Sequence, residues 1–273
     1  MGALPHIGAA IRAIDLEQPR FHGMPSFSAH GPGYSFVLHR RHEDAYAGGA
    51  RGPRTGSSGF IMTPEHAGTH IDAICHQAEH LELHGGVPAA TVATPTGYTR
   101  LGAEENPPIV ARGVLLDVAA HFGVDAVAPG TAIGAADLRA CAERADVSIG
   151  RGDVVLVRVG SGAHWHDPER YLAAAGVAAD GSEWLAAAGV SAVGADNLAW
   201  DVLGRRDEAY GCELPGHIIL LARHGIYIIE NLALEELAAA ARVTFTFICA
   251  PLKLVGATGA PVRPLALVPA GPG

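Results

Sequence analysis

The sequence has little of what marks secreted, membrane-bound and nucleic-acid-binding proteins. Its four cysteines are widely spaced and form no C-x-x-C pair, so we expect no disulfide framework. Lysine and arginine form no dense stripe, and the formal net charge of -9 disfavours nucleic acid as a partner. No apolar run reaches membrane-spanning length, and the first residues lack the pattern of a signal peptide. We therefore expect a cytoplasmic protein that binds neither nucleic acid nor a membrane.

Charged residues are also few, at 17%, whereas hydrophobic residues reach 49%, which is typical of an ordered chain with a large core. Residues 46–59 have the composition of a loop. Apolar runs predict strands at 35–38, 110–118, 153–159, 226–229, 243–248 and 262–268, and helical patterns predict helices at 134–145, 167–175 and 234–241, while 87–92 fits either. The alternation indicates a mixed α/β fold, and because no boundary is visible we expect a single domain over residues 1–273.

Histidine is abundant, with 15 residues, and it is concentrated in the segment His66-Ala-Gly-Thr-His70-Ile-Asp72-Ala-Ile-Cys-His76. In an extended chain, side chains two positions apart share a face, so these four even-numbered positions would point the same way. Gly68 would leave space between the two imidazoles that flank it. Two imidazoles and a carboxylate suit Zn²⁺, Mn²⁺ or Fe²⁺. We therefore predict a metal site built on His66, His70 and Asp72.

A catalytic metal needs further ligands from elsewhere in the chain. His217 is the best source, together with Glu230, which ends the apolar run IYII, where an unpaired carboxylate would be costly. Two other interpretations of the histidine segment stay open, a hydrogen-bonded polar cluster and a chance grouping on the surface. Asp196 is a candidate to accept the second N–H of a metal-bound histidine, with a helix N-cap as the alternative. His80 is a loop residue near the site and a candidate for contact with substrate.

The histidine segment resembles H-x-G-T-H-x-D-x-P-x-H, the signature of the cyclase family of metal-dependent hydrolases. That family includes bacterial kynurenine formamidase, isatin hydrolase and the trans-dienelactone hydrolases. Three further segments resemble it: Gly23-Met24-Pro25-Ser26-Phe27, the stretch from Leu214-Pro-Gly-His217 to Glu230-Asn-Leu, and Gly256-Ala-Thr-Gly-Ala-Pro-Val-Arg263-Pro. The resemblance implies a swivelling β/β/α domain with a mixed central sheet or barrel-like core. It also implies a homo-oligomer, either a homodimer or a homotetramer.

The resemblance assigns roles to individual residues. It implies that His66, His70 and Asp72 are the first ligands, and that Asp72 can bridge to a second ion. His217 and Glu230 would complete that two-ion site, and Glu230 would also belong to the catalytic group. His76 would be the proton shuttle. Phe27 matches an aromatic position that contacts substrate, with a plain core role as the alternative. The number of ions, and the choice between Zn²⁺ and Mn²⁺, stay open.

The expected function is that of a metal-dependent hydrolase, similar to arylformamidase or isatin hydrolase. Its activated water would attack an amide, imide, lactam or lactone bond of a small cyclic or aryl substrate. His76 suits the proton transfer because the pKa of an imidazole lies near the working pH. Two alternatives remain: a metal-dependent cyclase or dehydratase acting on a small carbonyl compound, and a non-catalytic, metal-stabilised protein that binds a small ligand.

Overall fold

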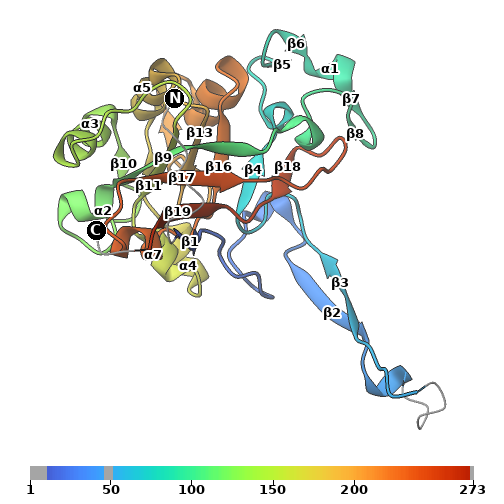
Figure 1. Ribbon diagram of the computed structural model, residues 1–273. Helices are drawn as coiled ribbons and strands as arrows, with labels where there is room; N and C mark the ends of the chain where they lie inside the picture. Colours follow the sequence, from blue (N-terminus) through green and yellow to red (C-terminus); the bar gives the residue numbers. More distant parts are fainter. Residues whose placement is uncertain (1–10, 46–51, 271–273) are drawn as a thin grey trace.

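Strands from both ends of the described chain meet in one curled, mixed sheet (Figure 1). The computed structural model describes residues 11–45 and 52–270. The sheet has nine strands, in the spatial order β1 (Ile11–Asp15), β19 (Leu265–Pro269), β17 (Thr244–Cys249), β9 (Ile109–Asp117), β11 (Val154–Arg158), β13 (Ala192–Ala195), β16 (Tyr227–Glu230), β4 (His70–Asp72) and β18 (Gly259–Pro261). The four strands from β9 to β16 are parallel, and every other pairing is antiparallel.

The central strands are buried on both faces, which explains their continuous apolar sequences. Val114 and Leu116 of β9 face one core and Leu115 faces the other, as the two-residue period of a strand requires. The first core lies under α2 (Val118–Phe122), α3 (Ala135–Arg144), α5 (Ala179–Ala188) and the π-helix η6 (Ile218–Arg223). The second core lies against the other face of the sheet and includes Leu237 of α7 (Glu235–Ala239).

Short elements surround this sheet. The helical ones are α1 (Ala89–Val92), α4 (Pro168–Leu172), α6 (Pro215–His217) and the 3₁₀ turns η1 (Ser28–His30), η2 (Glu43–Ala45), η3 (Ile74–His76), η4 (Ala103–Glu105) and η5 (Ser161–His164). The two-stranded sheets are β2 (Ser35–Arg40) with β3 (Ser58–Met62), β5 (Glu82–Leu83) with β6 (Val87–Pro88), β7 (Ala93–Thr94) with β8 (Gly97–Tyr98), β10 (Ala132–Ile133) with β12 (Gly176–Val177), and β14 (Arg206–Asp207) with β15 (Cys212–Glu213). None of the helices in the described ranges is long and apolar enough to cross a membrane.

The fold class expected from the sequence is confirmed, and the longer predicted elements are present within a few residues. Asp167 caps α4 by accepting a hydrogen bond from the Arg170 amide, with Pro168 in the first turn, as this pair predicts. The ambiguous segment 87–92 holds both a short strand and a helical turn. The predicted loop 46–59 is shorter than expected because β3 begins at Ser58, while residues 46–51 lie outside the described chain.

Candidate metal centre

The histidine segment does not run as one extended strand, so that prediction is wrong in part. Only His70 to Asp72 form a strand, β4, and His76 ends the 3₁₀ turn η3. His66 lies in a turn that Gly68 closes with a φ of 66°, a left-handed conformation that glycine adopts without strain. A Cβ on Gly68 would meet Nη1 of Arg20 at 2.8 Å. The glycine is thus needed for the turn and for the approach of Arg20, not as a gap between two imidazoles.

Arg20 and Asn231 hold this turn from two sides. The Arg20 guanidinium donates hydrogen bonds to the carbonyl oxygens of Ala67 and Thr69, on either side of Gly68. Asn231 donates its amide to the Gly68 carbonyl oxygen at 3.1 Å. These bonds satisfy the buried carbonyl oxygens of residues 67–69, which precede the strand β4. They also fix the position of the ligand side chains on both sides of the turn.

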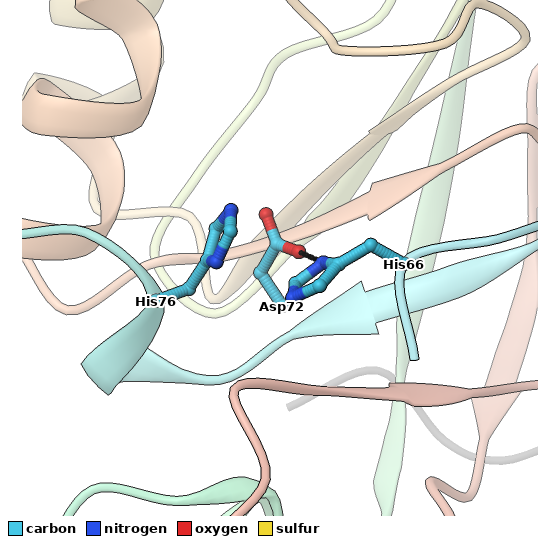
Figure 2. A group of neighbouring side chains, drawn as sticks. All are labelled: His66, Asp72 and His76. Atoms are coloured by element: carbon cyan, nitrogen blue, oxygen red, sulfur yellow. Dashed lines mark ion pairs between the residues drawn. The ribbon is translucent and has the colours of Figure 1, made fainter. Parts of the chain in front are cut away.

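One group of possible metal ligands comes entirely from this segment. His66, Asp72 and His76 place ligand atoms within 4.8 Å of one another, and Figure 2 shows the three side chains converging from the turn, from the end of β4 and from η3. Nδ1 of His66 lies 2.9 Å from Oδ1 of Asp72. Nε2 of His66 lies 2.8 Å from the Thr258 hydroxyl, which itself donates to Glu65 and therefore accepts from His66. The Nδ1 lone pair consequently faces a carboxylate oxygen, and that arrangement requires a proton or a cation between them.

A second group joins distant parts of the chain at Asp72. Asp72, His217 and Glu230 also place ligand atoms within 4.8 Å of one another. Nε2 of His217 lies 3.3 Å from Glu230 and 3.7 Å from Asp72. Nε2 of His70 lies 3.3 Å from Glu230 and 3.5 Å from Asp72. The structure therefore brings together all five ligands expected from the sequence, and Asp72 is common to both groups.

The buried ligand atoms have no hydrogen-bond partner of their own. Nε2 of His70, both carboxylate oxygens of Asp72 and Oε1 of Glu230 are all inaccessible to water and unpartnered. Buried polar atoms in native proteins are almost always satisfied, because desolvation without a partner is costly. Imidazole nitrogens and carboxylate oxygens are the donor set that Zn²⁺ and Mn²⁺ take. These residues therefore fit a divalent cation.

Outer hydrogen bonds leave the Nε2 lone pairs of two histidines free for a cation. Nδ1 of His70 lies 2.8 Å from the Gly68 carbonyl oxygen, which can only accept, so Nδ1 carries the hydrogen. Nδ1 of His217 donates in the same way to Asp201 at 2.8 Å. Such acceptors fix the tautomer and orientation of metal-binding histidines. The prediction that Asp196 takes this role is wrong: Asp196 instead accepts the backbone amides of Val159, Gly160 and Gly162, the last two at the start of η5.

Local backbone conformation sets His217 in place. It ends the helical turn α6, and the π-helix η6 follows at once. π-helical turns are rare and occur frequently at functional sites. A Cβ on Gly216 would lie 2.8 Å from both oxygens of Asp201, so only glycine permits the backbone to come this close. The Gly216 amide uses that approach to donate to Asp201 at 2.7 Å.

The buried charges at the site act strongly on one another. Burial alone would raise the pKa of Asp72, but attraction to the imidazoles of His76, His66 and His70 holds it well below its usual range. Burial alone would lower the pKa of His70, but attraction to the carboxylates of Asp72 and Glu230 raises it to about 10. The two carboxylates therefore favour positive charge between them. Burial lowers the pKa of His76 to about 3, so its imidazole is neutral at neutral pH, and the pKa near the working pH that was expected from the sequence is not found.

His30 is a fifth imidazole at this site, and no sequence motif singled it out. Its ring stacks on His66 with centroids 4.8 Å apart and lies 6.2 Å from His76. The predicted substrate contact Phe27 lies against His30, with ring centroids 5.7 Å apart, and is 37% exposed. These two rings from the segment of η1 are tilted by 51° to each other and form a border beside the ligands. His80, by contrast, is exposed before β5, and none of the described ring contacts or ion pairs of the ligands includes it.

Comparison with known proteins agrees with this arrangement. A family model described as "Putative cyclase" matches residues 14–202. The chain belongs to this family. A solved structure described as a novel cyclase shares 28% identity with a TM-score of 0.84, covering 93% of this chain and 86% of that chain. A predicted metal-dependent hydrolase from Bacillus stearothermophilus shares 25% identity with a TM-score of 0.61, covering 95% of this chain and 99% of that one.

An isatin hydrolase bound to the product analogue thioisatinate has the same fold. It shares 20% identity with a TM-score of 0.72, covering 95% of this cyclase-family chain and 93% of its own. No curated protein matches the chain. The expected family is thus confirmed. The chain is related to hydrolases, and it carries two groups of residues that can hold a metal ion.

Proposed function

We propose that this cyclase-family protein is a metal-dependent hydrolase of small cyclic or aryl substrates. The bond cleaved would be an amide, imide, lactam or lactone bond. The observation that carries the proposal is the cluster of buried, unpartnered ligand atoms on His70, Asp72 and Glu230 beside the neutral imidazole of His76. The relationship to an isatin hydrolase and to a metal-dependent hydrolase supports the same reaction class.

His66, His70, Asp72, His217 and Glu230 would hold Zn²⁺ or Mn²⁺, as one ion or as two that share Asp72. When bound, such an ion supplies Lewis acidity, which polarises a carbonyl group and makes water more acidic. Asp201 and the Gly68 carbonyl oxygen keep two of the imidazoles in the tautomer that ligation needs. The protein would therefore present a preformed set of ligands.

His76 would move the proton. Its imidazole accepts a proton from the attacking water and returns it to the leaving nitrogen or oxygen, which keeps the reaction balanced without another acid. The low pKa of His76, caused by burial, keeps the ring neutral before the reaction. Phe27 and His30 would orient a flat substrate at the border of the site. A positioned proton transfer of this kind is worth about 10²–10⁴ in rate.

A reconstitution experiment tests the proposal. Chelated protein would be loaded with Zn²⁺ or Mn²⁺ and assayed with N-formyl anilines, isatin, cyclic imides and unsaturated lactones, with the metal content measured in parallel. His76→Ala should keep its metal and lose about 10²–10⁴ in turnover. His80→Ala, four residues further on, should keep both, because its exposed side chain contacts no ligand. Full turnover in His76→Ala would reject the proton-transfer role.

The same assay separates the rival functions. One relative is described as a potential metal-dependent hydrolase with cyclase activity, so ring closure with loss of water is the alternative reaction. Turnover in ¹⁸O-labelled water puts the label into the product of a hydrolase, and a dehydrating cyclase leaves its product unlabelled. A protein that shows no turnover on any substrate, but melts at a lower temperature after chelation, would instead be a metal-stabilised binding protein.

A further inference from the structure

A pocket of about 260 Å³ lies where β9 ends and β17 begins, apart from the metal centre. Its walls come from the end of β9, from α2, from the end of α3, and from the chain that leads from α7 into β17. In Figure 1, α2 and α7 lie on one side of the molecule, whereas β4 and β18 lie toward the other. Three strands separate β9 from β4, which at about 4.8 Å per step puts them roughly 19 Å apart along the sheet. The pocket is therefore distinct from the candidate metal centre.

An unpartnered imidazole nitrogen lies beside this pocket. His121 lines the pocket from α2, and its Nδ1 atom is buried with no hydrogen-bond partner among the described residues. Seven side-chain atoms of the described chain are in this condition, and four of them belong to His70, Asp72 and Glu230. Because buried polar atoms are almost always hydrogen-bonded, such an atom indicates a place where a ligand group can bond. The feature that marks the metal centre therefore also marks this pocket.

Two guanidinium groups supply positive charge to the pocket. Arg144 at the end of α3 and Arg242 after α7 both line it, and Arg242 is partly buried. Arg144 donates from Nη1 to the His121 carbonyl oxygen at 3.2 Å, which uses one of the five N–H groups of its guanidinium. This bond joins α3 to α2 and holds the guanidinium beside His121. Since arginine binds carboxylate and phosphate groups through paired N–H donors, this lining suits an oxyanion.

The remaining lining limits the charge and the size of the ligand. Of the described residues that line the pocket, Asp117 is the one with a carboxylate, and Arg158 neutralises it through a hydrogen bond of 2.9 Å. Leu115, Cys141 and several alanines form the apolar part of the wall. Burial raises the pKa of the Cys141 thiol to about 11, so the thiol adds no negative charge. This lining suits a monoanion with a short apolar body better than a phosphate dianion.

We propose that this pocket is a second small-molecule site, which binds an organic monocarboxylate. The carboxylate oxygens accept hydrogen bonds from Arg144, from Arg242 and from Nδ1 of His121, in the tautomer that carries its hydrogen there. The apolar body of the ligand packs on Leu115 and Cys141. The volume is slightly below the roughly 300–1,000 Å³ of drug-sized sites, so the ligand is no larger than a substituted benzoate. The site does not depend on the proposed hydrolase activity.

A titration of the full chain with 4-fluorobenzoate, followed by ¹⁹F NMR, tests this site. A probe of this size should bind with a Kd on the order of 1 mM. The neutral isostere 4-fluorobenzamide should bind at least about 10-fold more weakly, because hydrogen bonds to a charged group are stronger than those to a neutral one. Inorganic phosphate is the competing anion, and it should not displace the benzoate at equal concentration.

Substitution of the lining arginines tests where the probe binds. Arg144→Gln with Arg242→Gln should weaken binding at least about 30-fold, since each lost charge-assisted hydrogen bond costs about 10-fold or more. Arg139→Gln with Arg151→Gln is the matched control. It removes the same two positive charges from exposed positions that do not line the pocket, and Arg139 instead lies over the ring of Trp184 at 5.7 Å. This control should bind the probe as the wild-type protein does.

A third variant tests the imidazole without a change in the arginines. His121→Phe removes the unpartnered Nδ1 and should weaken binding about 10-fold. It decides the question if circular dichroism shows that the double arginine variant is not folded. The wild-type titration is also repeated on protein freed of metal by dialysis, where the affinity should be unchanged.

Four results would count against the site. Equal binding by the double arginine variant and its matched control would overturn the proposal, and so would a wild-type protein without saturable binding. Binding that disappears with the metal would belong to the metal centre and would overturn it as well. Displacement of the benzoate by phosphate at equal concentration would reject a carboxylate as the ligand.

Discussion

The hydrogen bond between Asp201 and His217 allows a quantitative prediction. The two carboxylate oxygens of Asp201 each accept one N–H: Oδ1 accepts the Gly216 amide at 2.7 Å and Oδ2 accepts Nδ1 of His217 at 2.8 Å. An asparagine has the same shape but only one acceptor oxygen. In Asp201→Asn, one of the two N–H groups must therefore face the amide NH₂ group, where donor meets donor.

The expected loss follows from that mismatch. A hydrogen bond to a charged group contributes about 1.5–3 kcal/mol, which corresponds to roughly 10–100-fold in affinity. Loss of an acceptor behind a metal-binding histidine costs the same range in measured metal sites. We therefore expect Asp201→Asn to bind Zn²⁺ or Mn²⁺ about 10–100-fold more weakly than the wild-type protein, as measured by competition with a chelator of known affinity.

Asp196→Asn is the matched control. Asp196 is as buried as Asp201 and lies five residues before it, but its carboxylate accepts the amides of Val159 and Gly160 and contacts no ligand. This variant should lose stability and keep its affinity for the metal. If Asp201→Asn binds the metal as tightly as the wild type, the hydrogen bond does not orient His217 and our reasoning about the tautomer fails.

Two further predictions concern the turn and the pH dependence of folding. Gly68→Ala should lower the free energy of unfolding by about 1–3 kcal/mol, because alanine is strained at a φ of 66° and its Cβ would meet Arg20; an unchanged melting temperature would contradict this. Burial raises the pKa of Asp196 from 3.8 to about 6, and this difference corresponds to about 3 kcal/mol. The folded protein holds this proton more tightly than the unfolded chain, so the stabilisation is complete below about pH 3.8 and is lost as the pH rises through about 6. In urea titrations, the free energy of unfolding of the wild type relative to that of Asp196→Asn should therefore fall between pH 4 and 6. A difference between the two proteins that stays the same over this pH range would refute the prediction.

The sequence predicted the central part of the sheet well. Strands such as β9 and β11 carry continuous apolar runs because much of β9 and all of β11 are buried, so their patterns are strong. β4 and β18 have only three residues each, and their pairing defines them as strands: β4 pairs with β16 and β18, and β18 pairs with β4. A run of three residues is too short to show the alternation of apolar and polar residues that marks a strand in the sequence. The same limit explains why an extended strand was expected from His66 to His76 where only its middle is one.

The residues of the candidate site also fall into two groups, those that the sequence predicted and those that it did not. His66, His70, Asp72 and His76 are close in sequence, so their spacing alone indicated a cluster. His30, Asp201 and Thr258 reach the ligands through tertiary contacts between loops far apart in the chain. Their residue types are ordinary surface or cap residues in any single segment. One signal existed for Asp201: an aspartate near a ligand segment can accept from it, and the choice of Asp196 was wrong by five residues.

The pairing of β16 with β4 links ion binding to the assembly of the sheet. Glu230 is placed directly opposite His70, and its neighbour Ile229 opposite Ile71. Because side chains alternate between faces, a slip of one position would send the acid into the hydrophobic interior and turn an isoleucine toward the ion. Bound metal would therefore report that β16 and β4 have paired in the correct register, and separation of these two strands should release the metal before the rest of the protein unfolds.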